Sequence, residues 1–322
     1  MDYSVAGIIT TAARRENDLL NLLSALEELT IPLQKIYIIY DGTVSLSERI
    51  LKSGLTQAVV WIRSASQVPI TFEQNKVISQ ISQKYILLMN DDIIPDPYFL
   101  QFLISSLEQM NEVGMGCGKL IRMDKQTIDS AGQIISRSRR PIDRGYGEKD
   151  RGQFDTPGFV FGCCGAAVLY RRDMLQDISI SPGEYFDNEY NMFYDDLDIS
   201  WRAQNQGWKA FYNPKAIAYH HRGLTAKINK PKLKFLEKYS FAWLSSRLKS
   251  DLVKNRYMTI IKNDNLKGFI LNLPFIFLYD LKLWTYLLIF DLRAAGMLLK
   301  KTKVILKAWE KRRIIFENMK KS

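Results

Sequence analysis

Two clusters of carboxylate side chains and one histidine carry most of the chemistry that this sequence offers. Residues 90–92, Asn-Asp-Asp, end the apolar run 85–89, and residues 194–196, Tyr-Asp-Asp, open a stretch with helical periodicity. His220 follows Asp196 by 24 residues. Carboxylate, amide and imidazole groups are ligands for Mg²⁺ or Mn²⁺, and a carboxylate is also a common general base. The sequence therefore predicts a divalent-metal site beside a general base.

Asn90 and Asp92 are the candidates for the metal ligands in the first cluster. They are two residues apart after a predicted strand, so in an extended segment their side chains point the same way, and Asp91 points the other way. A hard cation takes one or two carboxylates together with phosphate oxygens of a substrate. The alternative is an ordinary turn after the strand, where acidic residues are common.

Asp195 and Asp196 are the candidates for the general base. They belong to a run that has three acids in the four residues 195–198. Adjacent acids repel, which raises the pKa of one of them toward a value suited to taking a proton. The alternative is helix capping, because acidic side chains stabilise the N-terminal end of a helix.

His220 and its neighbour His221 are the two histidines of the chain. A lone histidine is more often structural than a metal ligand. Two of them at the end of a predicted strand, in a chain with no others, favour a functional site.

The segments that must position these residues alternate between strand-like and helix-like patterns. Runs rich in Ile, Val and Tyr predict strands, and apolar residues at helical spacing predict helices. The strands are expected at residues 5–10, 35–40, 58–62 and 85–90, and the helices at 17–29, 45–52 and 71–80. This alternation favours parallel βαβ units with right-handed crossovers. Ligands of such sheets bind at the carboxyl ends of the strands, where Thr11, Asp41 and residues 90–92 fall.

The middle of the chain has a weaker pattern. Residues 122–158 are polar and only weakly periodic, which predicts a long irregular loop, either functional or disordered. A core segment at 158–170, a helix at 196–207 and short strands at 208–212 and 216–219 should follow. The small residues at 162–167 either let the backbone approach a ligand closely or allow tight packing.

The C-terminal part of the chain is basic. Residues 227–322 hold 22 basic and 7 acidic side chains, a balance of +15, whereas the rest holds 23 basic and 27 acidic, a balance of −4. We therefore divide the chain into a catalytic domain, 1–226, and a helical region, 227–322. Such an asymmetry indicates an anionic partner, and we expect an anionic membrane surface.

Helices in the region 227–322 should break at residues 263–265 and at Pro274. The longest uncharged piece, 268–279, has 12 residues, whereas a spanning helix needs about 20. Apolar and aromatic residues mixed with Lys and Arg suit a helix that lies in the plane of the lipid headgroups. The alternative is an appendage that forms a homo-oligomer.

Composition narrows the class of protein. With 47% hydrophobic and 12% aromatic residues, the chain is globular. Three cysteines give no disulfide framework, which suggests a reducing cytoplasm, and the first residues do not predict a secretory signal. The sequence has neither a phosphate-binding glycine loop nor a nucleophile elbow. It also has no nucleic-acid-binding signature, so we expect no nucleic acid as a partner.

The order of these motifs resembles the inverting glycosyltransferases of family 2, which have the GT-A fold. The resemblance covers roughly residues 3–225 and is most specific in its last segment. The segments that carry it are ITTAARREND (9–18), IIYDGT (38–43), ILLMNDDIIPDPYFL (86–100), GCCGAAVLYRRDML (162–175) and FYDDLDISWRAQNQGWKAFYNPKAIAYHH (193–221).

This resemblance implies an α/β fold in which a Rossmann-like mixed sheet is flanked by helices. It implies Asp196 as the catalytic base with Asp195 as its neighbour. It also implies Mg²⁺ or Mn²⁺ as the cofactor, held by Asn90, Asp92 and His220. Asn90 stands where the family's DXD motif has its first acid, so Asp92 is the expected main ligand. The residues expected at the nucleotide are Thr11, Arg14, Asp41 and Asp91, and Asp41 looks like the acid that recognises the nucleobase.

Within the family, residues 128–133 (IDSAGQ) and 143–155 look most like bacterial rhamnosyltransferases of cell-wall and O-antigen synthesis. The implied donor is a dTDP- or UDP-sugar, first of all dTDP-rhamnose, and the implied acceptor is a saccharide linked to polyprenyl diphosphate. The protein would then lie peripherally on the cytoplasmic face of the cell membrane. A galactofuranosyl- or N-acetylhexosaminyltransferase is the alternative within the fold.

Two alternatives come from other classes. A sugar nucleotidyltransferase would carry a glycine-rich phosphate loop after the first strand, and residues 9–17 lack the glycines. A non-enzymatic protein that binds anionic polymers would leave the acidic clusters unexplained.

Overall fold

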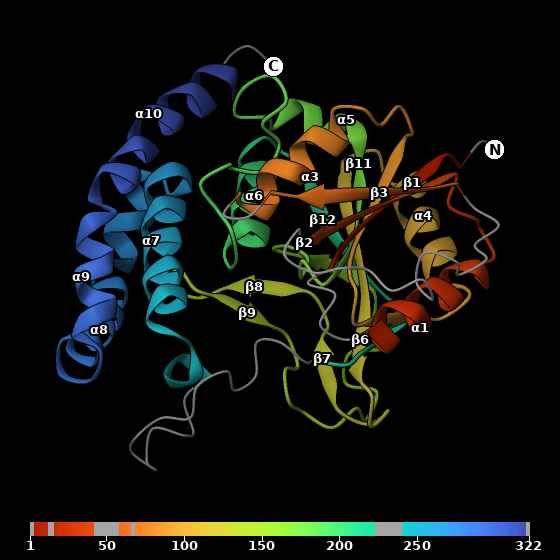
Figure 1. Ribbon diagram of the computed structural model, residues 1–322, viewed down its shortest axis with the longest axis horizontal. Coiled ribbons are helices and arrows are strands. Elements are labelled where there is room, and N and C mark those ends of the chain that lie inside the picture. Colours follow the sequence, from red (N-terminus) through yellow and green to blue (C-terminus); the bar gives the residue numbers. More distant parts are fainter. Residues whose placement is uncertain (1–2, 12–15, 42–57, 66–67, 223–239, 320–322) are drawn as a thin grey trace.

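The computed structural model of the chain describes residues 3–11, 16–41, 58–65, 68–222 and 240–319. At its centre is a mixed sheet with the strand order β10-β12-β6-β11-β4-β1-β2-β3 (Figure 1). Helices cover the sheet, and a layer of C-terminal helices stands at one side of it (Figure 1). This architecture confirms the predicted α/β class.

The N-terminal half forms the parallel part of the sheet. Strand β1 (Val5–Thr11) lies between β2 (Lys35–Asp41) and β4 (Tyr85–Asn90), and β3 (Ala58–Ser64) is at the edge. All four strands begin where the sequence pattern predicts them. Their parallel pairing brings their carboxyl ends to the same edge of the sheet.

The other half of the sheet mixes strand directions. The strands are β5 (Ile93–Pro95), β6 (Val113–Arg122), β7 (Ile128–Ser130), β10 (Gly158–Val160), β11 (Ala167–Arg171) and β12 (Lys209–His220). The prediction of two short strands around Pro214 is wrong, because β12 runs through it. The pairing of β12 with β6 shifts its register between Asn213 and Ile217, and this irregularity accommodates a proline that cannot donate a hydrogen bond.

Two hydrophobic clusters pack the helices on opposite faces of the sheet, because neighbouring strand residues point to opposite sides. Leucines of α1 (Glu16–Glu27) and α4 (Phe99–Gln109) fill one cluster. The second cluster is filled from α3 (Ile70–Ile78), α5 (Arg172–Asp177) and α6 (Asp195–Asn205). The helix predicted at 45–52 lies outside the described residues.

Residues 122–158 contain more regular structure than the sequence suggests. Besides β7, they form a separate two-stranded hairpin from β8 (Gln133–Ile135) and β9 (Pro141–Asp143). The prediction of an irregular loop is wrong at these strands, because three residues are too few to show a period of two. The hairpin lies between the main sheet and the C-terminal helices (Figure 1).

The C-terminal layer consists of α7 (Ser246–Asn263), α8 (Leu266–Phe290), α9 (Leu292–Lys300) and α10 (Thr302–Met319), after a 3₁₀ turn at Ser240–Trp243. The predicted break at 263–265 is confirmed. The predicted break at Pro274 is wrong, because this proline lies inside α8. An interior proline costs a helix about 3 kcal/mol, and the 25-residue helix α8 continues past it. The predicted boundary between residues 226 and 227 falls outside the described residues.

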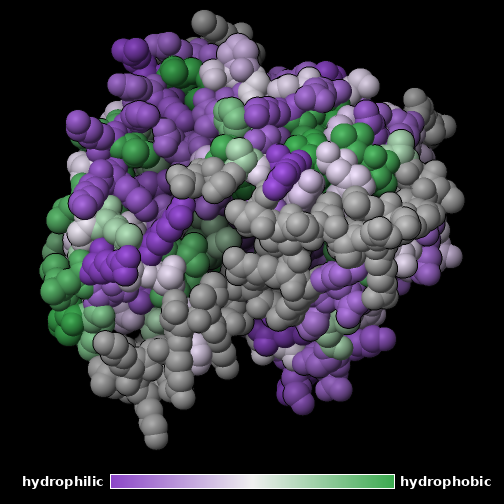
Figure 2. Space-filling view, viewed as in Figure 1, coloured by the Kyte–Doolittle hydropathy of each residue, from purple (hydrophilic) through white to green (hydrophobic). Residues whose placement is uncertain are grey.

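Helix α8 exposes most of its apolar surface. Ile276, Leu283 and Leu287 are its buried residues. Its exposed large apolar residues are Leu266, Ile270, Leu271, Leu273, Phe275, Phe277, Leu278, Leu281, Leu288, Ile289 and Phe290. Apolar residues gather over α8 at the left edge of the molecule (Figure 2). By length and composition alone, α8 could cross a membrane, and 17% of its most apolar window is buried.

Candidate active site

The first part of the site lies where β1 and β4 end side by side. Thr10 stands opposite Asn90 in the pairing of the two strands and donates a hydrogen bond to Asn90 Oδ1 at 3.5 Å. The hydroxyl of Thr11 donates to Asp91 Oδ2. Burial raises the pKa of Asp91 to about 6, although the hydrogen bond from Thr11 acts in the opposite direction. Thr11 and Asp91 therefore link the two strand ends.

Asp92 and His220 meet because β5 pairs antiparallel with β12. In this pairing, His220 is opposite Ile93, the residue after Asp92. The Nε2 atom of His220 lies 3.3 Å from Asp92 Oδ1. Two predicted metal ligands from distant parts of the sequence thus face each other.

Asp129 holds the other nitrogen of the His220 ring. Its Oδ2 atom lies 2.7 Å from His220 Nδ1, and its Oδ1 atom accepts a hydrogen bond from Arg222. Burial alone would lower the pKa of His220, but Asp129 and Asp92 raise it to about 9. A carboxylate on one ring nitrogen fixes the orientation of the other, as it does for many metal-ligating histidines. Asp129 therefore points His220 Nε2 toward Asp92.

This donor set fits a hard divalent cation. Asn90, Asp92 and His220 offer amide oxygen, carboxylate and imidazole groups, which suit Mg²⁺ or Mn²⁺. Within the described residues, no group of three or more His, Cys, Asp or Glu side chains is arranged to hold a metal ion. Such a cation would therefore need further oxygens from a substrate. The three ligands stay a prediction.

The predicted base follows a strained turn. Phe193 and Tyr194 both have left-handed backbones, with φ angles of 69° and 67°. Such conformations cost about 1–3 kcal/mol each and persist only where the surroundings hold them. Here Asn255 on α7 donates hydrogen bonds to the carbonyls of Met192 and Phe193, at 2.8 and 2.9 Å. Helix α7 thus fixes the turn that aims Asp195 and its neighbour.

Asp196 accepts three hydrogen bonds at the start of α6. Gln133 of the hairpin donates from Nε2 at 2.6 Å, and the backbone N–H groups of Gly165 and Leu197 donate at 3.3 and 2.8 Å. A side chain at Gly165 would bring a Cβ to within 3.3 Å of Asp196 Cβ. The small residues 162–167 were expected either to approach a ligand or to pack tightly, and at Gly165 tight packing against α6 explains the glycine.

Asp143, Asp195 and Asp196 are half-buried acids that lie near one another. Burial raises the pKa of Asp196, while its hydrogen bonds from Gln133 and the backbone lower it. Burial and the charge of Asp196 together raise the pKa of Asp195 to about 7. The same two causes raise the pKa of Asp143 to about 6. A carboxylate in this range is suited to accept a proton near neutral pH.

Asp143 and Arg222 connect the acidic half of the site to the histidine half. Asp143 pairs with Gln133 across the hairpin, and Arg222 Nη2 lies 3.7 Å from Asp143 Oδ2. Arg222 also binds Asp129, the partner of His220. A continuous series of contacts therefore runs from the predicted base to the predicted metal ligands.

The remaining predicted residues are those expected at the nucleotide. Asp41 ends β2 and follows Tyr40, which pairs with Thr11. It therefore lies at the edge of the sheet where β1 and β4 also end. Arg14 lies outside the described residues. The roles of Thr11, Arg14, Asp41 and Asp91 at a nucleotide stay predictions.

Sequence reasoning missed Asp129 and Gln133 as site residues. Both belong to the segment 128–133, which we used only to compare subgroups of a family. The pattern that could have indicated them is a pair of polar residues, Asp129 and Gln133, on either side of the small residues 130–132. Asn255 had no local signal, because its role comes from packing of α7 beside the turn.

A buried ion-pair cluster holds α6 against α7. Asp198 is bound by Arg202 at 3.1 Å and by Lys262 at 2.9 Å, and Lys262 also binds Asp187 at 2.5 Å. Lys262 and Asp187 are fully buried side chains. Without Lys262, each buried carboxylate would keep a single cation, Arg202 for Asp198 and Lys311 for Asp187, and buried charge would be less well compensated.

We expect Lys262→Met to lower the free energy of unfolding by about 3–5 kcal/mol, because two buried carboxylates lose their shared cation. The measurement is urea denaturation of the full chain. Lys303→Met, on the exposed surface of α10, is the matched control and should change the midpoint little. Equal midpoints for the two variants would contradict the structural role of the cluster.

Comparison with known proteins identifies the family. Residues 5–246 match the family described as "Glycosyltransferase like family 2", and the chain belongs to this family. None of the curated proteins that were compared matches the chain.

Two solved structures show the same fold at 10% sequence identity. One is GalNAc-T7 with UDP, GalNAc and Mn²⁺, with a TM-score of 0.56; the match covers 79% of this chain and 47% of that one. This chain thus spans about half the length of GalNAc-T7. The other is the mannosyltransferase PcManGT from Pyrobaculum calidifontis with GDP-Man and Mn²⁺, with a TM-score of 0.53, covering 98% and 85%. The predicted GT-A fold is confirmed.

Proposed function

We propose that this chain is a metal-dependent, inverting glycosyltransferase that moves a sugar from a nucleotide diphosphate to a hydroxyl group. The observation that carries the proposal is the position of Asp196. It is a half-buried carboxylate at a helix start, held by Gln133 and connected through Asp143, Arg222 and Asp129 to His220. A base connected in this way to a cation-binding site suits a reaction in which the acceptor hydroxyl displaces the nucleoside diphosphate in one step.

In this proposal, Asp196 takes the proton of the acceptor hydroxyl as that oxygen attacks the anomeric carbon. Asp195, with its raised pKa, is partly protonated near neutral pH, which limits the negative charge of the two acids. Asn90, Asp92 and His220 would hold Mg²⁺ or Mn²⁺, which neutralises charge on the departing diphosphate. Asp129 orients His220. The nucleotide would lie along the edge formed by the ends of β1, β2 and β4.

The donor that we propose first is dTDP-rhamnose. Its support is the resemblance of residues 128–133 and 143–155 to rhamnosyltransferases, together with the contacts that Asp129, Gln133 and Asp143 of these segments make around the site. UDP-galactofuranose and UDP-GlcNAc are the alternatives. The proposed acceptor is a saccharide linked to polyprenyl diphosphate.

A panel of nucleotide sugars tests this function. The full chain is incubated with each donor, with Mn²⁺ or with EDTA, and release of the nucleoside diphosphate is measured. One donor should be turned over only with the metal. Absence of turnover with every donor, or equal turnover in EDTA, would overturn the proposal.

We also propose that the protein lies on the cytoplasmic face of a membrane through its C-terminal helices. Helix α8 packs on α9 with one stripe and exposes its other apolar residues. The region 227–322 carries a balance of +15 charges. Basic residues near an anionic surface contribute about 1 kcal/mol each. A homo-oligomer formed through the same face is the alternative.

Phe277→Ser with Leu281→Ser is expected to weaken binding to phosphatidylglycerol vesicles by about tenfold or more, because both side chains are exposed on one face of α8. Sedimentation with vesicles measures the loss. Met123→Ser with Phe159→Ser removes two exposed apolar residues elsewhere and is the matched control. Unchanged sedimentation of the α8 variant, with loss of a dimer in solution, would favour the oligomer instead.

A further inference from the structure

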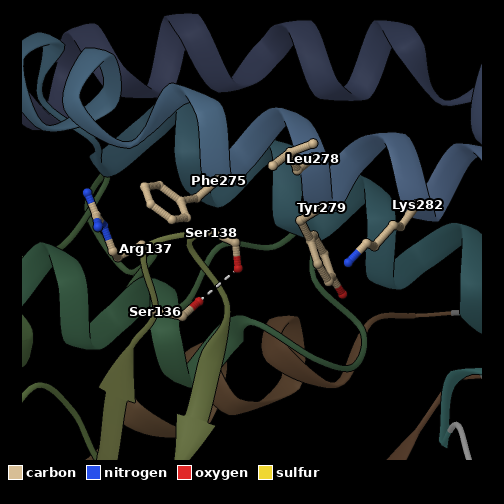
Figure 3. A pocket seen from close by; sticks show the side chains of 7 residues that line it. All are labelled: Ser136, Arg137, Ser138, Phe275, Leu278, Tyr279 and Lys282. Atoms are coloured by element: carbon tan, nitrogen blue, oxygen red, sulfur yellow. Dashed lines mark hydrogen bonds between the residues drawn. The ribbon is translucent and has the colours of Figure 1, made fainter.

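A cavity of about 350 Å³ lies between α8 and the turn of the hairpin β8–β9 (Figure 3). Phe275, Leu278 and Tyr279 of α8 form its apolar wall. The opposite side is polar and comes from residues 136–138 of the hairpin turn. The residues that line the cavity are Ser136, Arg137, Ser138, Phe275, Leu278, Tyr279 and Lys282.

Two cations and two hydroxyl groups face this cavity. Arg137 stacks over Phe275, with its guanidinium carbon 3.8 Å from the ring centroid, and Lys282 lies at the other end (Figure 3). Neither makes an ion pair with any residue that the structure describes. The hydroxyls of Ser136 and Ser138 lie between them, 3.0 Å apart.

Two acids close to the lining residues already have cationic partners: Asp280 follows Tyr279, and Asp264 is paired with Arg139, the residue after Ser138. Asp264 is bound by Arg139, and Asp280 is bound by Arg256 at 2.8 Å. The cavity lining itself contains no acid. Its chemistry is therefore that of an anion site with an apolar wall. Guanidinium and ammonium groups bind phosphate with charge-assisted hydrogen bonds, and hydroxyls add neutral ones.

The hairpin connects this cavity to the catalytic carboxylate. Ser136 is three residues from Gln133, which donates to Asp196. Three residues of extended chain span about 10 Å. A phosphate in the cavity would thus lie about 10 Å along the hairpin from the residue that holds the base. On the other side, the exposed apolar face of α8 continues from the cavity wall.

We propose that this cavity binds the diphosphate of a lipid-linked acceptor, so that the lipid lies along α8 and the saccharide extends along the hairpin toward Asp196. The inference rests on the proposed function and deepens it, because it locates the acceptor of the same reaction. Arg137 and Lys282 bind the phosphates, and Phe275 and Leu278 contact the first part of the hydrocarbon chain.

Farnesyl diphosphate is a suitable probe, titrated into the full chain by calorimetry with EDTA present. Removal of metal keeps the probe's diphosphate from binding through a cation at the nucleotide edge. Arg137→Gln with Lys282→Gln should weaken binding at least about tenfold, because two charge-assisted contacts are lost. Lys303→Gln with Arg313→Gln removes the same charge from α10 and should leave binding unchanged. Lys282→Arg keeps the charge and should bind as the wild type does.

Inorganic pyrophosphate and phosphatidylglycerol vesicles distinguish the sources of the anion. We expect pyrophosphate to bind more weakly than farnesyl diphosphate, and vesicle binding to be equal in the pocket and control variants. Equal affinity of the pocket variant for farnesyl diphosphate would overturn the proposal. Vesicle binding that falls with the pocket variant, without a change for farnesyl diphosphate, would assign the cavity to bulk lipid headgroups and also overturn it.

Donor hydrolysis without acceptor separates this inference from the proposed function. The pocket variant should hydrolyse the donor at the wild-type rate and lose transfer to a lipid-linked acceptor. If no donor is turned over but the probe still binds in the cavity, the proposed function fails and the binding site stands. If the donor is turned over and the variant transfers to the lipid-linked acceptor normally, the binding site fails alone.

Discussion

Asp196→Asn is expected to lower kcat by about 10²–10⁴, the usual contribution of one positioned base, while the Kd of the donor stays nearly unchanged. The amide has the shape of the carboxylate, and its one oxygen can still accept from Gln133 and Gly165, but it cannot take up the proton of the attacking hydroxyl. The measurement is kcat with the donor found in the panel, together with donor binding by calorimetry.

Asp173→Asn is the matched control for this change. It replaces an exposed acid in the first turn of α5, which corresponds to the place of Asp196 in α6. Its turnover should equal that of the wild type. Near-normal turnover of Asp196→Asn would remove this residue from the role of base.

The same residue pair sets the expected pH dependence. A base must be ionised, so turnover should fall as the pH falls through the pKa of the Asp195–Asp196 pair. Because burial raises the pKa of Asp196, this fall should occur at a higher pH than for an exposed aspartate. A rate that stays constant down to pH 5 would contradict the proposed environment of the pair.

Asp92→Ala is expected to abolish metal-dependent donor binding. Asp92 is the carboxylate of the predicted ligand set, and it faces His220 Nε2 at 3.3 Å. Asp129→Asn should weaken metal binding by about 10–100-fold, the usual effect of losing the partner that orients a ligating histidine. Calorimetry of the donor with and without Mn²⁺ measures both effects.

Asp124→Asn provides the control for the metal series. Asp124 is an exposed acid in a turn near the same strands, where it accepts hydrogen bonds from Thr127. It should bind the donor and Mn²⁺ as the wild type does. If Asp92→Ala retains the full effect of Mn²⁺, the cation is held elsewhere on the protein.

Local sequence patterns were sufficient to predict the parallel half of the fold. Strands β1 to β4 are short runs of β-branched and apolar residues, and burial on both faces makes such runs distinct. The acidic cluster at the end of β4 was visible from its residue types, and the helix predicted at 196–207 begins one residue earlier, at Asp195. The meeting of Asp92 with His220 was expected only from the family resemblance, and it arises because β5 pairs antiparallel with β12.

Long-range contacts account for what the sequence did not show. Gln133 reaches Asp196 only because the hairpin β8–β9 lies beside α6, and strands of three residues leave little pattern. Helix α8 continues past Pro274, since one interior proline did not outweigh the rest of a long helix. In both cases, tertiary packing overrides the local preference of the chain.

The hydrogen bonds from Asn255 to the turn before Asp195 have a practical consequence for anyone who shortens this protein. The family match ends at residue 246, the first residue of α7. A fragment cut there would keep every side chain assigned to catalysis. It would lose the amide that keeps two left-handed residues in place, and its acids would no longer be aimed at a substrate.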